Sequence, residues 1–117
     1  MVEDFVRRTF EEKRDAKTYK YASITVTDGD TTAAVWTPAS GKSIRLSSAI
    51  ISVTAASVVE LRWESTTFCH LEFNDRKAVP LYLPFDLKGG KDKRLIVYFK
   101  PDSGSATCYI TVQGEEE

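Results

Sequence analysis

Short stretches in which apolar and polar residues alternate, separated by turn-forming residues, recur along most of this 117-residue chain. Residues 58–64 (VVELRWE) are the clearest example, with Val59, Leu61 and Trp63 on one parity and charged residues on the other. Successive side chains of a β-strand point to opposite faces of its sheet, so this alternation predicts strands with one buried face. The pattern leaves little room for helical structure after residue 17.

The alternation and the turn signals together predict about eight short strands. Turn-forming runs such as DGD at residues 28–30 and PDSGS at residues 101–105 separate them. Strands spaced by about 8–12 residues are typical of antiparallel sandwiches and barrels. We therefore predict an all-β fold, an antiparallel eight-stranded β-sandwich of jelly-roll type, over residues 18–114, followed by an acidic tail at residues 115–117. The predicted strands are residues 19–27, 31–36, 43–53, 58–64, 67–73, 79–85, 94–100 and 106–112.

Two of these strands carry signs of irregularity. In residues 43–53 the favoured apolar parity changes near Ser48, which indicates a β-bulge or a bend. Residues 79–85 (VPLYLPF) contain Pro80 and Pro84, and a proline cannot donate a hydrogen bond to a neighbouring strand. We therefore expect this strand at the edge of a sheet.

Residues 1–17 form a charged N-terminal arm that differs from the rest of the chain. Its apolar residues Val2, Phe5, Val6 and Phe10 approximate helical spacing, which is compatible with a short amphipathic helix. Two interpretations stay open: a frayed terminus, or an arm that becomes ordered when Phe5, Val6 and Phe10 pack against a neighbouring molecule. In the second case these three residues are interface candidates.

Charge and hydropathy exclude several classes of partner. With 16 Lys and Arg against 17 Asp and Glu, the formal net charge is −1, so the chain has no general attraction for nucleic acid or for anionic membranes. No apolar run approaches the roughly 18 residues that a membrane-spanning helix needs. The N-terminus carries charges where a signal peptide would have an apolar core, and we predict no cleaved signal.

No residue pattern predicts catalysis, a metal site or a cofactor. The single histidine, His70, lies mid-strand and most simply sits on the surface or packs there. Cys69 and Cys108 fit apolar strand positions, which favours two buried thiols over a disulfide. Cys69 and His70 are adjacent and so point to opposite faces, which disfavours a zinc site. We expect that the chain is not an enzyme.

Aromatic residues offer the better candidates for ligand contacts. Trp36 precedes the loop that contains Pro38, and Tyr82 lies in the proline-containing strand. Exposed together beside polar loops, they would suit a carbohydrate or a receptor. Trp63 shares a strand face with Val59 and Leu61, so core packing is its better interpretation.

The segment from Thr31 to Arg62, TTAAVWTPASGKSIRLSSAIISVTAASVVELR, resembles the small β-sandwich structural proteins of tailed bacteriophages. These include head decoration proteins, head fibres and tail-associated receptor-binding modules. The resemblance extends in general layout over residues 20–114 and at motif level over residues 35–62, and it leaves out the arm. It implies a homo-oligomer, commonly a trimer, with contacts to other virion proteins such as the major capsid protein, and it carries over no catalytic residues.

Two functions follow as expectations. The first is a non-enzymatic virion structural protein, most simply a capsid decoration or head-surface protein that acts through oligomer and capsid contacts. It would be made in the host cytoplasm and located in the virion. The alternative is a carbohydrate- or receptor-binding β-sandwich module that uses Trp36 and Tyr82.

Overall fold

A computed structural model describes residues 18–117 of the chain, with the side chains of residues 82–86 left out. These residues form eight strands and confirm the predicted all-β sandwich. The strands are β1 (Thr18–Thr27), β2 (Thr31–Trp36), β3 (Ile44–Val53), β4 (Ser57–Trp63), β5 (Thr66–Phe73), β6 (Lys77–Lys88), β7 (Leu95–Pro101) and β8 (Ser105–Glu116).

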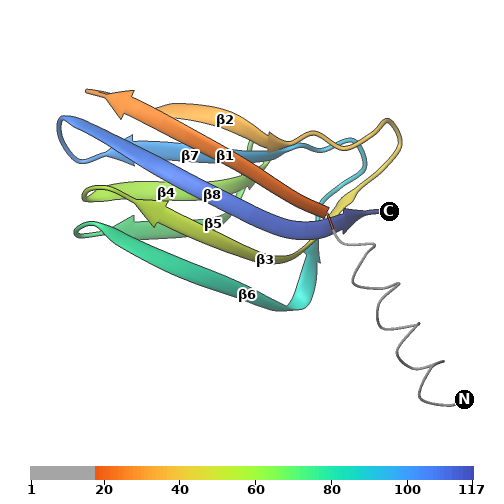
Figure 1. The fold of residues 1–117 in the computed structure, drawn as a ribbon. Helices are drawn as coiled ribbons and strands as arrows, with labels where there is room; N and C mark the ends of the chain where they lie inside the picture. The colour runs from red at the N-terminus through yellow and green to blue at the C-terminus, as the bar shows by residue number, and fades with distance from the viewer. Residues whose placement is uncertain (1–17) are drawn as a thin grey trace, which may run out of the picture.

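The strands form two four-stranded sheets that pack face to face (Figure 1). One sheet has the order β1-β8-β3-β6 and the other β2-β7-β4-β5, and all neighbouring strands are antiparallel. Successive strands alternate between the two sheets, except that β4 and β5 are neighbours in the same sheet. This strand order is that of a jelly roll, in which two Greek keys are nested.

Side chains from both sheets fill the space between them. Phe99 of β7 is fully buried, as are Leu46 and Ile51 of β3 and Ile110 of β8 to within 1 %. Trp63 packs against this core and stacks on Phe68, with ring centroids 4.8 Å apart. The predicted core role of Trp63 is confirmed. Every second residue along the strands faces inward, and these residues from both sheets meet in one continuous core.

The predicted irregularities lie where the sequence placed them. The pairing of β3 with both neighbours shifts register between Leu46 and Ser48, which confirms the bulge. Strand β6, with its prolines, lies at the edge of its sheet. A further register shift between β4 and β5 leaves Phe68 without a partner residue, and both Phe68 and the adjacent Cys69 then pack against the core.

The predicted acidic tail is instead part of the sheet. Strand β8 continues to Glu116, and Glu117 exchanges two backbone hydrogen bonds with Ser43 at 2.8 and 3.0 Å. The Glu117 carboxylate accepts hydrogen bonds from Arg45 at 2.6 and 3.0 Å and pairs with Lys88 at 3.1 Å. These cations lower the pKa of Glu117 to about 2. Repeated glutamates suggested a solvated end, whereas basic partners on β3 and β6 order it.

Both cysteines are free thiols in the described part of the chain, as favoured from the sequence. Cys108 of β8 lies in the core and Cys69 of β5 packs against the core from the other sheet. Burial raises the pKa of the Cys108 thiol to about 12. Over residues 18–117 we find no helix long and apolar enough to span a membrane.

Candidate functional site

The structure contradicts the prediction that Trp36 is an exposed ligand contact. Only 3 % of Trp36 is exposed, and its indole Nε1 donates a hydrogen bond to Glu116 Oε1 at 3.2 Å. The same oxygen accepts a bond from the backbone N–H of Ala39 at 3.0 Å, so Glu116 ties the loop after β2 to the end of β8. The Lys20 ammonium lies 5.8 Å from the Trp36 ring centroid. Trp36 is therefore part of the packing at this end of the sandwich.

The other predicted site residues fall outside what the structure describes. The side chain of Tyr82 lies among the side chains left out at residues 82–86. Phe5, Val6 and Phe10 lie in residues 1–17, which also stand outside the described part. Their roles stay predictions.

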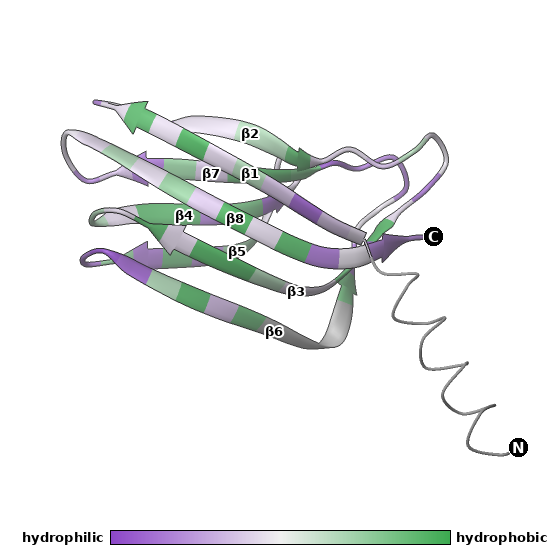
Figure 2. Ribbon diagram, viewed as in Figure 1, coloured by the Kyte–Doolittle hydropathy of each residue, from purple (hydrophilic) through white to green (hydrophobic). Residues whose placement is uncertain are grey.

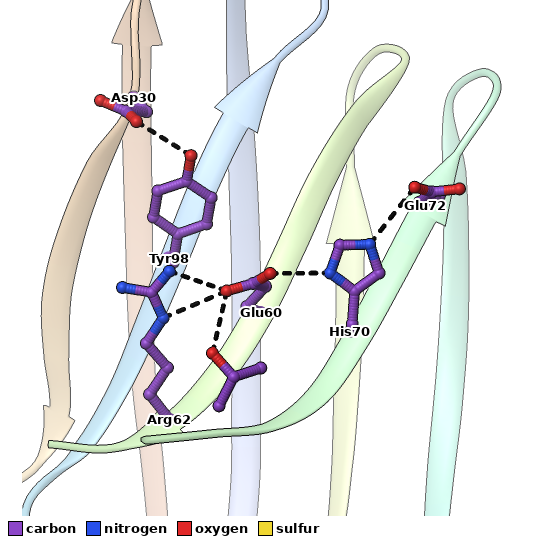
Figure 3. A network of polar contacts seen from close by, with 7 residues as sticks. Asp30, Glu60, Arg62, His70, Glu72 and Tyr98 are labelled. Carbon is purple, nitrogen blue, oxygen red and sulfur yellow. Dashed lines mark hydrogen bonds and ion pairs between the residues drawn. The ribbon is translucent and has the colours of Figure 1, made fainter. Parts of the chain in front are cut away.

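A network of polar side chains covers the outer face of the β2-β7-β4-β5 sheet (Figure 3). Its centre is Glu60 of β4, which accepts hydrogen bonds from Arg62 at 2.7 and 3.2 Å and from Thr67 at 3.0 Å. The ring of His70 lies 2.7 Å from the second carboxylate oxygen. The bond from Arg62, and next that from His70, lower the pKa of Glu60 to about 2. Glu60 is thus ionised throughout the neutral range.

His70 stands between two carboxylates on this face. Its Nδ1 is 2.7 Å from Glu60 Oε2 and its Nε2 is 3.3 Å from Glu72 Oε1. The hydrogen bond with Glu60, and then that with Glu72, raise the pKa of His70 above its usual 6.5. When protonated, the imidazolium donates to both carboxylates. The arrangement favours the charged ring and weakens His70 as a general base.

The chain holds one histidine, so its titration can be followed directly by NMR. We expect the His70 midpoint to lie above 6.5, and Glu60→Gln to lower it because the stronger acceptor is lost. Because the folded pKa of His70 is raised, its contribution to stability is complete below pH 6.5 and is lost as the pH rises through the folded value. Glu72→Gln, which removes the longer contact, is the control and should shift the midpoint less. An unchanged midpoint in Glu60→Gln would contradict the network.

The network continues to β7 and to the turn before β2 through an aromatic ring. The guanidinium of Arg62 lies 4.4 Å from the centroid of the Tyr98 ring, a cation–π contact. The Tyr98 hydroxyl donates to Asp30 Oδ2 at 2.9 Å, and this bond raises the pKa of Tyr98. Side chains of β5, β4 and β7 and of the turn just before β2 are therefore linked on one face.

Two of the four basic residues at 88–94, Lys88 and Arg94, pair with acids. Arg94 donates three side-chain bonds to Glu64 at 3.0 to 3.2 Å, and Lys88 pairs with Glu117 as described above. Gly41 N donates to Asp92 at 2.6 Å, which joins this loop to the one after β2. Within the described residues, no three His, Cys, Asp or Glu side chains gather to hold a metal ion.

The outer face of the other sheet, β1-β8-β3-β6, has a different character. No Asp, Glu, Lys or Arg occupies its described outward positions between the bulge and the opposite ends of the strands; we call this surface the neutral face. Figure 2 shows these strands mainly in white and green, with the purple of hydrophilic residues mostly near strand ends and loops. The neutral face consists of Tyr19, Tyr21, Ser23, Thr25, Thr27, Ser48, Ile50, Ser52, Ala78, Pro80, Ser105, Thr107, Tyr109, Thr111 and Gln113.

The exposed aromatic residues that the sequence analysis passed over lie on the neutral face. Tyr19, Tyr21 and Tyr109 are among the most exposed large hydrophobic side chains of the described residues, together with Ile50. The sequence contained a sign of this surface, because every second residue of residues 19–27 (Tyr, Tyr, Ser, Thr, Thr) is uncharged. The pairing of β1 with β8 and of β8 with β3 then extends that property over four strands.

Comparison with known proteins shows where this fold occurs. No protein-family model and no curated protein matches the chain. A chain of the cyanophage Pam1 capsid asymmetric unit has a TM-score of 0.56 at 11 % identity, over 84 % of this chain and 83 % of that chain. A de novo designed double-stranded β-helix aligns with a TM-score of 0.40 at 12 % identity, over 83 % of this chain and 97 % of that one. PirA aligns at 0.41 and 10 % identity, over 84 % and 94 %. The chain thus shares its fold with a phage capsid chain, and the two weaker likenesses carry no argument.

Proposed function

We propose that this chain is a non-enzymatic structural protein of a phage virion, a decoration or head-surface protein that acts as a homotrimer on the capsid. The observation that carries the proposal is the shared jelly roll with a chain of the Pam1 capsid, over similar shares of both chains. Similar shares mean that the two chains have nearly the same length, so the likeness extends over most of each chain. The resemblance of residues 35–62 to phage sandwich proteins supports the same role.

The chemistry of the described surface is consistent with such a role. Several of its charged side chains are held in ion pairs, among them Glu60–Arg62 and Glu64–Arg94, and His70 lies between two carboxylates. The mechanism in this proposal is burial of surface between copies and against the shell, without covalent chemistry. Small sandwiches favour such assembly because symmetric oligomers cover exposed edges and faces.

The test is the solution mass by light scattering, together with binding to capsid shells. We expect the full-length protein to form an assembly of about three times the chain mass of 13.1 kDa. We also expect it to co-sediment with shells built from the major capsid protein of the same genome. A chain lacking residues 1–17 serves as the comparison, since Phe5, Val6 and Phe10 are the predicted interface residues; we expect it to dissociate. A monomer at high concentration that leaves the shells unbound would overturn the proposal.

The alternative, a saccharide- or receptor-binding module, loses one of its two predicted contacts because Trp36 is buried. The observation that keeps it in view is the group of exposed tyrosines Tyr19, Tyr21 and Tyr109, because aromatic rings with neighbouring hydroxyl groups suit a neutral sugar. A glycan array separates this alternative from the first proposal, with Tyr21→Ala as the variant that should remove any signal.

A further inference from the structure

The neutral face differs from the outer face of the other sheet in its lack of charge. Lys and Arg with Asp and Glu make up 28 % of the sequence, yet none lies on this face. The first charged pair along these strands is Arg45 opposite Glu115, beyond the bulge. The opposite outer face instead carries Glu60, Arg62 and their partners. Depletion of charge with enrichment of tyrosine is the composition of interface centres.

The centre of the neutral face is apolar and well exposed. A row across the four strands joins Tyr21, Thr111, Ile50 and Pro80. Tyr109 lies two residues before Thr111 on β8 and is diagonal to Tyr21 and Ile50. Tyr21 is 62 % exposed and Ile50 is 55 % exposed. Side chains of this kind gain free energy when a partner removes them from water.

Six polar side chains of the neutral face form three pairs with one another. Thr25 and Thr107 hydroxyls are 2.9 Å apart, and the Thr27 hydroxyl lies 3.3 Å from that of Ser105. Ser48 donates to Gln113 at 3.3 Å. Hydroxyl groups that are partly satisfied within their own sheet cost less to bury. Short Ser and Thr side chains also lose little conformational entropy when a partner holds them.

These properties select a partner that brings no charge of its own. A charged partner surface would bury unpaired ions against Tyr21 and Ile50, which is costly. A second neutral face is uncharged, and it is available at every copy of the chain. If the charged outer face of the other sheet contacted the neutral face instead, its ion pairs would be buried in the contact.

We propose that the neutral faces of neighbouring copies meet, turned towards the symmetry axis of the homo-oligomer. This inference rests on the homo-oligomer of the proposed function and assigns its contact surface. In a trimer, three neutral faces surround the three-fold axis, and Tyr21, Ile50 and Tyr109 fill the space between them. The networked face of each copy then points outward.

The experiment compares single variants that carry a new negative charge on one outer face or on the other. Ile50→Glu and Tyr21→Glu, made singly in the full chain, put a carboxylate in the neutral face, and Ala34→Glu puts the same charge on exposed β2 of the other sheet. Light scattering over a dilution series gives the mass of each variant. We expect Ile50→Glu and Tyr21→Glu to weaken association by about 100-fold or more, and Ala34→Glu to leave it unchanged. Thermal unfolding and circular dichroism confirm that each variant folds.

The outcomes separate this inference from the proposed function. A trimeric parent whose Ile50→Glu and Tyr21→Glu variants stay trimeric, or whose Ala34→Glu variant dissociates equally, overturns the assignment of the neutral face and leaves the virion role standing. A parent dimer broken by Ile50→Glu supports the face and overturns the trimer. A monomeric parent overturns the inference, and shell binding then decides on the virion role alone. A glycan-array signal that Tyr21→Glu abolishes assigns the face to a saccharide and overturns the inference.

Discussion

Gly114→Ala is expected to destabilise the sandwich by about 3 kcal/mol, because no space exists for a side chain at this position. A Cβ on Gly114 would overlap the backbone carbonyl oxygen of Arg45 and lie 3.2 Å from the Cα of Leu46. Both obstacles are backbone atoms of β3, which cannot rotate away as a flexible side chain would. Strand β8 approaches β3 this closely next to the bulge between Leu46 and Ser48.

Urea unfolding measures this effect, with Gly104→Ala as the matched control. Gly104 has a positive φ of 65° in the turn before β8, and nothing lies within 4 Å of a Cβ placed there. Its substitution carries only the backbone cost of that conformation, about 1 kcal/mol. Equal losses at the two glycines would show that the close approach of β8 to β3 is relaxed in solution.

Phe99→Ala is expected to cost about 3–5 kcal/mol, a large part of the roughly 5–15 kcal/mol that stabilises an ordinary domain. Phe99 is fully buried on β7, which lies between β2 and β4 in the centre of its sheet. Removing its ring leaves a cavity that the two fixed sheets cannot close. We expect a much lower urea midpoint, or a chain that fails to fold at ordinary temperature.

The neighbouring residue provides the control for Phe99. Lys100 is exposed on the same strand and points the other way, so Lys100→Ala should change stability by less than about 0.5 kcal/mol. A small loss at Phe99 would contradict the packing of the two sheets around β7. A large loss at both residues would indicate that β7 itself, and not its inner face, is sensitive to substitution.

The strands could be predicted because their signals are local. The alternation of apolar and polar residues predicted a strand at residues 31–36, and β2 has the same bounds in the structure. The change of apolar parity at Ser48 predicted the bulge. Pro80 and Pro84 placed β6 at an edge, since an inner strand needs the hydrogen bonds that proline lacks.

What the sequence could not show depends on residues far apart in the chain. Trp36 seemed exposed because a loop follows it, but its partner Glu116 lies at the other end of the sequence. The same distance hid the order of the last residues, which Arg45 and Lys88 hold in place. The neutral face was missed because it appears only when β1, β8, β3 and β6 are known to be neighbours.

The strand order also determines when the molecule can complete its folding. Strand β1 pairs only with β8 in its sheet, so Thr18 meets Gly114 near the opposite end of the chain. Only β4 and β5 pair across a short turn, and the other pairings join distant segments. Folds dominated by distant contacts fold slowly, in about milliseconds to seconds. On the ribosome, β1 and β3 must therefore wait for the last residues to emerge before their shared partner β8 can enter between them.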